Sequence, residues 1–102
     1  MAIIHLDAEN FGREVLEAQT PVLVDFWTSR CGPCRMLAPT LDSFAAHHPQ
    51  VKVCKANVDE TAELASQYGV RSVPTLMVFE KGQPTRRSVG VISQQEIEKL
   101  IF

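Results

Sequence analysis

Short apolar runs alternate along this chain with segments whose apolar residues recur at helical spacing. Runs of aliphatic, aromatic and β-branched residues predict strands over residues 3–6, 22–27 and 75–79, and alternation of apolar and polar residues predicts one over residues 51–58. Residues 87–91, which follow a predicted turn, are expected to return as an antiparallel partner strand. Apolar residues three or four positions apart predict helices near residues 11–16, 33–48, 61–68 and 93–101. Strands that alternate with helices, followed by a hairpin with its turn at residues 81–84 and a last helix, predict an α/β fold. We expect a central mixed sheet of about five strands, flanked on both faces by about four helices.

Polar residues and one proline refine the predicted helices. Asp7 or Asn10 can cap the first helix. Pro39 falls inside the second helix, where a proline removes one backbone hydrogen bond, so we expect a kink there. Ser93 and Glu96 have the spacing of a capping box, which predicts the start of the last helix.

The bulk composition limits the possible classes of function. A chain of 102 residues with 45% hydrophobic content suits one folded domain over residues 1–102. The formal charge of −2 and the lack of a basic run argue against binding to nucleic acid or to an anionic membrane. No apolar segment approaches the length of a membrane span. Because a strand-like segment directly follows Met1 in place of a charged leader, we expect a cytoplasmic protein, and we expect a monomer.

A C-x-x-C pair lies where the strand over residues 22–27 gives way to a helix. Cys31 is expected at the helix N-terminus, where unpaired N–H groups and the helix dipole favour a thiolate. Gly32 and Pro33 separate the two cysteines, and Pro33 stiffens a turn in which its missing N–H costs little. Cys34, inside the first turn, should be more buried and less acidic. The pair therefore suits one attacking thiol and one resolving thiol.

Zinc binding is the alternative use of this pair. In the cytosol a C-x-x-C is either catalytic or metal-binding, and His47, His48 or Cys54 could complete a zinc site. The two histidines are adjacent and would point about 100° apart on a helix. Cys54 is expected in mid-strand, as a small buried apolar residue. Redox chemistry is therefore favoured, and no metal is expected.

A longer pattern surrounds the cysteine pair. The segment from Asp25 to Pro39 reads Asp-Phe-Trp-x-x-x-Cys-Gly-Pro-Cys-Arg-Met-Leu-Ala-Pro. Further matches follow at residues 55–59, 68–75, 79–82 and 89–90. Together these segments resemble the thioredoxin family over essentially the whole chain. The resemblance implies the thioredoxin fold, a redox-active disulfide between Cys31 and Cys34, and no bound cofactor. It also implies disulfide-containing substrate proteins and a thioredoxin reductase as partners.

The resemblance implies roles for two charged residues. Asp25 interrupts an apolar strand, so it is either a carboxylate at a strand edge or a buried acid whose pKa is raised by desolvation. Thioredoxin-like proteins use the matching acid as a proton acceptor for the resolving thiol. Lys55 matches a lysine that modulates this acid, although a strand lysine can also simply face solvent.

The resemblance also implies a surface for substrates. Pro74 would follow Val73 through a cis peptide bond packed against the disulfide, which exposes the Val73 backbone to a substrate strand. The simpler alternative is a proline at the start of a strand. Trp27, Gly90 and Val91 would complete an apolar contact surface around Cys31, although Trp27 could instead pack in the core.

Arg30 departs from the family pattern, which commonly has tryptophan directly before the first cysteine. Together with Arg35, Arg30 should stabilise the Cys31 thiolate and lower its pKa, which makes the disulfide more oxidising. It could also shift substrate preference toward acidic surfaces. Gly32 and Pro33 still favour a reductant. We therefore predict a protein-disulfide reductase, with an oxidase or isomerase of the same fold, or a binding subunit of a larger complex, as alternatives.

Overall fold

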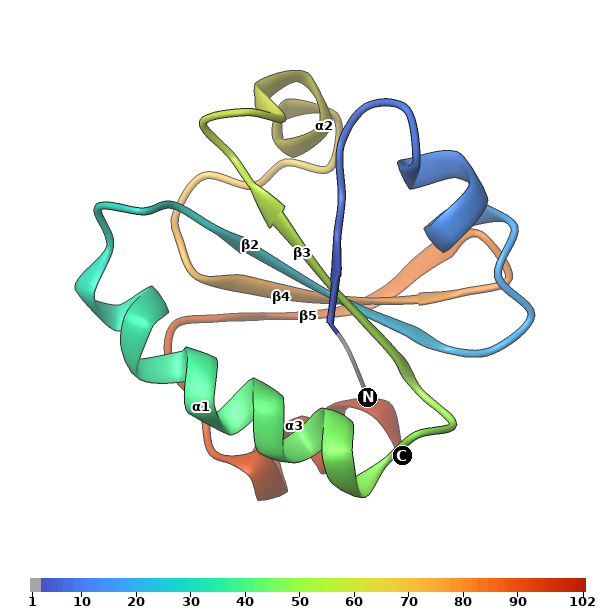
Figure 1. The fold of residues 1–102 in the computed structure, drawn as a ribbon, viewed down its shortest axis with the longest axis vertical. Coiled ribbons are helices and arrows are strands. Elements are labelled where there is room, and N and C mark those ends of the chain that lie inside the picture. The colour runs from blue at the N-terminus through green and yellow to red at the C-terminus, as the bar shows by residue number, and fades with distance from the viewer. Residues whose placement is uncertain (1–2) are drawn as a thin grey trace.

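The computed structural model describes residues 3–102, which form a central sheet with helices on both sides (Figure 1). Its elements are, in chain order, β1 (Ile4–His5), the π-helical turn η1 (Gly12–Leu16), β2 (Val22–Trp27), α1 (Gly32–His47), β3 (Lys52–Asn57), α2 (Ala62–Gln67), β4 (Thr75–Glu80), β5 (Gln83–Val89) and α3 (Gln94–Ile101). The predicted mixed α/β fold is confirmed, with five strands in one sheet. No helix among these residues is long and apolar enough to cross a membrane.

The sheet has β2 at its centre. The strand order is β1-β3-β2-β4-β5, with β3 parallel to β2 and β4 antiparallel to it. Asp25 of β2 lies opposite Lys55 on one neighbouring strand and Leu76 on the other. Every residue of β2 except Trp27 is buried. A strand that is covered on both faces needs a nearly continuous apolar sequence, as β2 has.

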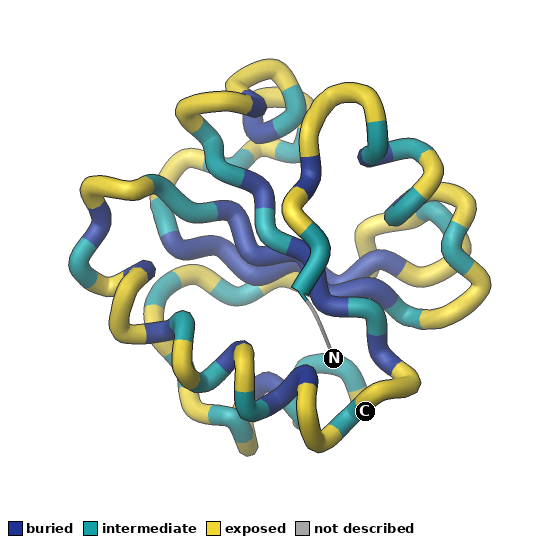
Figure 2. The backbone as a smooth tube through the Cα atoms, in the orientation of Figure 1, coloured by how far each residue is buried: buried dark blue, intermediate teal, exposed yellow. Residues whose placement is uncertain are grey.

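Alternate residues of the strands enter two separate cores. One core lies between the sheet and the helices α1 and α3, and contains Leu23, Leu37, Leu41, Phe44, Val53, Leu76 and Ile97. The other lies under η1 and α2, and contains Phe11, Val15, Val24, Phe26, Cys54, Ala65, Met77 and Phe79. Figures 1 and 2 show these helix pairs on opposite sides of a dark, buried sheet. Residue 23 faces one core and residue 24 the other, which is the two-residue period of a strand.

The first helix lies where the sequence predicts it, but it is a π-helix and its expected cap is wrong. The segment is a single π-helical turn in which the Glu17 N–H donates to Gly12 O at 3.0 Å. Asp7 instead accepts the backbone N–H groups of Glu9 and Asn10, each at 2.8 Å, so it caps the turn before the helix. The N-cap position of η1 itself has no side-chain hydrogen bond.

The last strand begins earlier than predicted. The turn contains only Lys81 and Gly82, both with positive φ, so β5 starts at Gln83 rather than at residue 87. A two-residue hairpin turn requires such backbone angles. Pro84 is tolerated inside β5 because β5 is an edge strand. The strand also ends earlier than predicted, at Val89, so Gly90 and Val91 follow it.

Two predicted helix features can be followed directly. Ser93 Oγ accepts the N–H of Glu96 at 3.1 Å, and Glu96 Oε1 accepts the N–H of Ser93 at 3.0 Å, so the capping box is confirmed. Pro39 lies inside α1, and the helix continues past it to His47. A long α1 therefore starts at the end of β2 and crosses the sheet.

Leu41 tests the packing of α1 on the sheet. Its side chain is fully buried, so Leu41→Ala should lower the free energy of unfolding by roughly 2–5 kcal/mol, through lost apolar contact and a cavity. Met36 lies on the same helix with 69% of its surface exposed, so Met36→Ala should change that free energy by less than about 0.5 kcal/mol. Denaturant unfolding of the oxidised proteins measures both, and equal losses would contradict this packing.

Candidate active site

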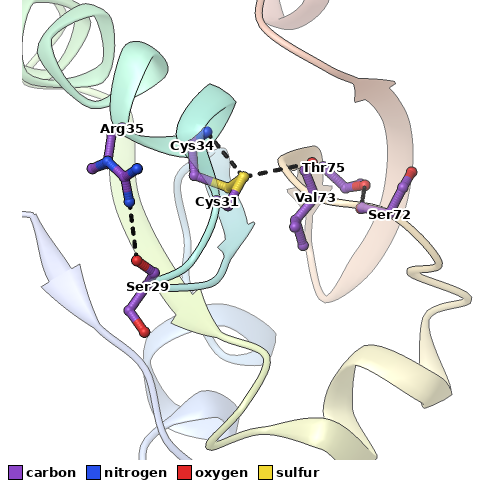
Figure 3. Close-up of a disulfide and its surroundings, with 7 residues drawn as sticks. All are labelled: Ser29, Cys31, Cys34, Arg35, Ser72, Val73 and Thr75. Carbon is purple, nitrogen blue, oxygen red and sulfur yellow. Dashed lines mark hydrogen bonds between the residues drawn. A yellow bond between two sulfur atoms is a disulfide. The ribbon is translucent and has the colours of Figure 1, made fainter.

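The cysteine pair lies where the central strand ends and α1 begins (Figure 3). Cys31 is the N-cap residue of α1, and it forms a disulfide with Cys34 in the first turn, with their Cα atoms 5.2 Å apart. Gly32 and Pro33 occupy the first helical positions between them, where the missing proline N–H leaves no bond unmade. Cys31 is 8% exposed and Cys34 3% exposed. The more accessible sulfur thus belongs to the first cysteine.

Backbone groups of α1 surround Cys31. The Cys34 N–H points at Cys31 Sγ over 3.0 Å, and the Arg35 N–H donates to Cys31 O at 3.2 Å. If the disulfide is opened, the same N–H group and the helix dipole favour a thiolate at Cys31. The local geometry therefore suits Cys31 as the nucleophile of the pair.

The loop before β4 approaches Cys31 from another part of the chain. The Val73–Pro74 peptide bond is cis, and Val73 O lies 3.8 Å from Cys31 Sγ (Figure 3). The Thr75 hydroxyl donates to Ser72 O at 2.7 Å. The Gly90 N–H donates to Pro74 O at 2.9 Å, so the segment after β5 lies beside the same loop. The structure thereby brings together residues that are more than forty positions apart in sequence.

Asp25 is a buried carboxyl on the central strand. Its exposed fraction is 0%, so it is not a strand-edge carboxylate that faces solvent. Neither of its oxygens has a hydrogen-bond partner among residues 3–102. Burial raises the pKa of Asp25 to about 7, and this shift is opposed by the positive charge of Lys55 on the adjacent strand. A carboxyl with such a pKa can exchange a proton near neutral pH.

Lys55 and Trp27 lie together beside this carboxyl. Lys55 is half-buried, and its Nζ lies 4.8 Å from the centre of the Trp27 ring, which is a cation–π distance. Trp27 is half-buried as well, and its Nε1 is enclosed without a hydrogen-bond partner among the described residues. Trp27, the last residue of β2, therefore contacts the charged group of Lys55 and is not an ordinary core residue.

The two arginines near the cysteines have different surroundings. Arg35 Nη1 donates to Ser29 O at 3.1 Å, which ties α1 back to the preceding loop. Arg30 is exposed, and none of residues 3–102 accepts a hydrogen bond from it or forms an ion pair with it. Val91 is also exposed, by 43%. The surroundings of the disulfide thus combine apolar groups with uncompensated positive charge.

Sequence reasoning missed a hollow beside Val73. It has a volume of about 180 Å³ and is lined by Thr28, Val58, Val70, Arg71, Ser72 and Val73. Val58 ends a predicted strand and Val70 lies between a predicted helix and the next predicted strand, and nothing in their sequence spacing indicates that they meet. The backbone bond from the Val58 N–H to Trp27 O, at 2.8 Å, brings the end of β3 to this place.

The residues required for the zinc alternative do not meet. His47 and His48 are at the C-terminal end of α1, whereas the cysteine pair is at its N-terminal end. Cys54 lies in the core under η1 and α2, where burial raises the pKa of its thiol to about 12. Over residues 3–102, no three His, Cys, Asp or Glu side chains are grouped so that they could hold a metal ion.

The raised pKa of Asp25 predicts a pH-dependent stability. The carboxyl has a pKa of about 7 when folded and an ordinary value of 3.8, so the folded state holds the additional proton between these pH values. The free energy of unfolding should therefore fall as the pH rises from about 4 to about 7. In Asp25→Asn this component is absent. The free energy of unfolding of the variant minus that of the parent should therefore rise by up to about 4 kcal/mol between pH 4 and pH 8.

Denaturant unfolding across this pH range measures the difference between the two oxidised proteins. A second variant, Lys55→Met, removes the charge that lowers the pKa of Asp25, so its loss of stability should extend to higher pH. A difference between Asp25→Asn and the parent that stays constant with pH would contradict a raised pKa.

Comparison with known proteins agrees with this geometry. The thioredoxin family model matches residues 2–102. The chain is 55% identical to thioredoxin 1 of Synechococcus elongatus over 83 residues, which cover 80% of this chain and 78% of that protein. It is 43% identical to the thioredoxin of Pseudomonas aeruginosa over 96 residues, which cover 93% and 89% of the two chains. The chain therefore belongs to the thioredoxin family, and with its Cys31–Cys34 pair it is a thiol–disulfide oxidoreductase.

Proposed function

We propose that this protein reduces disulfide bonds of other proteins in the cytosol, as a single-domain monomer. The observation that carries the proposal is the position of the Cys31–Cys34 disulfide. Cys31 lies at the N-terminus of α1, within 3.8 Å of the Val73 carbonyl, on a rim that combines apolar and positive groups. Such a place favours a thiolate, and the Val73 backbone beside it offers a partner for an extended substrate segment.

The first step is an attack by the reduced protein on a substrate disulfide. The Cys31 thiolate forms a bond to one substrate sulfur, and the bond between the two substrate sulfurs breaks. The second substrate sulfur leaves as a thiolate and takes a proton from water. The product of this step is a mixed disulfide between Cys31 and the substrate.

The second step releases the substrate and uses the buried acid. Cys34 gives its proton to the carboxylate of Asp25, and the Cys34 thiolate then attacks Cys31 Sγ. The mixed disulfide breaks, the remaining substrate sulfur leaves in its reduced form, and the Cys31–Cys34 disulfide closes. Lys55 supports this step because its charge keeps the pKa of Asp25 from rising further. Two electrons pass from the protein to the substrate.

Substrate binding is assigned to the surface around Cys31. An extended segment would pair with the Val73 backbone next to the cis Pro74 and would contact the apolar groups of Trp27, Gly90 and Val91. A thioredoxin reductase, the partner that the family implies, would return the protein to its dithiol form. No bound cofactor takes part in this scheme.

A more oxidising function is the second candidate, and Arg30 is the observation that favours it. An exposed guanidinium directly before Cys31 stabilises the thiolate, and a stabilised dithiol form makes the disulfide a stronger oxidant. The Gly32–Pro33 pair favours the reductant. A binding subunit of a larger complex would use the same fold without thiol chemistry. In that case a Cys31→Ser, Cys34→Ser double variant would keep its function.

The reduction potential separates these candidates. The protein is equilibrated with a series of dithiothreitol or glutathione mixtures, and the free Cys31 and Cys34 thiols are counted by alkylation. For a general reductant we expect a value near the reference for thioredoxins, about −270 mV. A value nearer −180 mV, the approximate reference for protein disulfide isomerase, would instead indicate an oxidase or isomerase. If no intramolecular disulfide forms at any potential, thiol chemistry is refuted.

Replacement of the resolving thiol should trap substrates. In Cys34→Ser the first step still proceeds, but the second cannot, so mixed disulfides through Cys31 accumulate. We expect covalent partners in a cell extract that are released by dithiothreitol and are absent with Cys31→Ser. Equal recovery of partners with both variants would contradict Cys31 as the nucleophile.

A further inference from the structure

We propose that the surface around Cys31 that carries Arg30, Arg35 and Arg71, here called the rim, selects disulfides flanked by carboxylates. Arg30 is its main specificity-determining residue. This inference rests on the proposed function, since it names the substrate class of the same site. It comes from three arginines that three different segments bring around Cys31: the loop before α1, the first turn of α1 and the loop before β4.

Arg30 is the residue closest in sequence to the nucleophile. It directly precedes Cys31, so the Cα atoms of the two residues are about 3.8 Å apart. Its side chain is exposed and has no ion-pair or hydrogen-bond partner within the part of the chain that the structure describes. Its charge is therefore available to a bound substrate.

Arg35 and Arg71 extend this positive charge to both sides of Cys31. Figure 3 shows Arg35 on the side of the disulfide away from Val73, where its bond to Ser29 O holds it. Arg71 is exposed and lines the hollow that also contains Val73. A segment that pairs with the Val73 backbone beside Cys31 would thus have positive charge toward both of its ends.

The acidic residues nearby form no ion pair with these three arginines. Asp25 is fully buried under the surface. Asp59 and Glu60 follow Val58 at one end of the hollow, on the turn that leads to α2. None of the ion pairs among residues 3–102 involves Arg30, Arg35 or Arg71. The three arginines outnumber the two exposed acidic residues Asp59 and Glu60, so the rim keeps an excess of positive charge although the formal charge of the chain is −2.

A substrate in extended form would present its charges within reach of the rim. Successive residues of a strand are about 3.3 Å apart, so the neighbours of the reacting cysteine lie well within one Debye length, about 10 Å, of the arginines. A carboxylate at these positions is attracted, and guanidinium matches its two oxygens in shape. An amine is repelled. Charge next to the substrate cysteine should therefore change the rate of the first step.

Two matched peptides test this selection. Each contains one intramolecular disulfide, and they differ only at the two residues that flank the first cysteine, which are glutamate in one and lysine in the other. Pre-reduced protein is mixed with each peptide at low salt, and the second-order rate constant of peptide reduction is measured after acid quenching. The ratio of the two constants is compared between the parent and Arg30→Glu, which cancels the intrinsic reactivity of the peptides.

Lys81→Glu is the matched control, since it makes the same change in net charge. Lys81 lies in the turn at the far end of β4 from Pro74, and a strand of six residues spans roughly 20 Å, beyond the Debye length. We expect the glutamate-to-lysine rate ratio to be about tenfold higher for the parent than for Arg30→Glu. The ratio for Lys81→Glu should stay within about twofold of the parent.

The outcomes separate this proposal from the proposed function. The selection is overturned if both peptides are reduced and Arg30→Glu has the same ratio as the parent. It is also overturned if Lys81→Glu lowers the ratio as much as Arg30→Glu, because the net charge would then be the cause. If the parent reduces neither peptide, the reductase function itself fails, and the selection fails with it. The selection is supported if the glutamate-to-lysine rate ratio of the parent falls at high salt, because salt screens the charges of the arginines.

Discussion

The double-sided burial of β2 is the constraint on which the rest of this structure depends. Because β3 and β4 pair with both of its edges and a helix layer covers each face, β2 has a single possible register and direction. The loop that leaves β2 is therefore held at one place, and α1 starts from it. The position of Cys31 follows from the core rather than from any contact of its own side chain.

The same constraint explains the chemistry of Asp25. A carboxyl in the centre of a two-sided core loses its hydration, and no donor among residues 3–102 replaces it. The folded protein is less stable for this reason, and an apolar residue would pack better at this position. In return, the carboxyl of Asp25 gains or loses its proton near pH 7, whereas a solvent-exposed aspartate is already charged at this pH. Stability and reactivity are thus opposed at one residue.

Much of the fold could be predicted because its signals are local. The continuous apolar run of β2 and the helical spacing of α1 do not depend on distant residues, and the capping box at Ser93 lies within four residues. Where prediction was wrong, distant contacts or backbone angles decided the outcome. The early start of β5 at Gln83 results from the positive φ angles of the preceding turn, which the residue types Lys and Gly do not specify by themselves.

The site shows the same division. The cysteine spacing and its place between strand and helix are visible in the sequence, and the resemblance to thioredoxins supplies further candidates. In contrast, the hollow beside Val73 requires the ends of β2 and β3 and the loop before β4 to meet. The positive rim is likewise invisible in a chain with a formal charge of −2, because Arg30 and Arg71 are forty-one positions apart. Only tertiary structure places them at one surface.

The edge strand β5 has a consequence for the proposed binding of extended substrates. Any sheet with an open edge can recruit foreign strands by backbone pairing, and this can lead to aggregation. Here Pro84 removes one donor from that edge, and Arg86 adds an exposed charge. The neighbouring Arg87 turns back to the carbonyl groups of Tyr68 and Gly69. The outer strand thus resists unspecific sheet extension, so an extended substrate would pair beside the disulfide, as proposed, and not along β5.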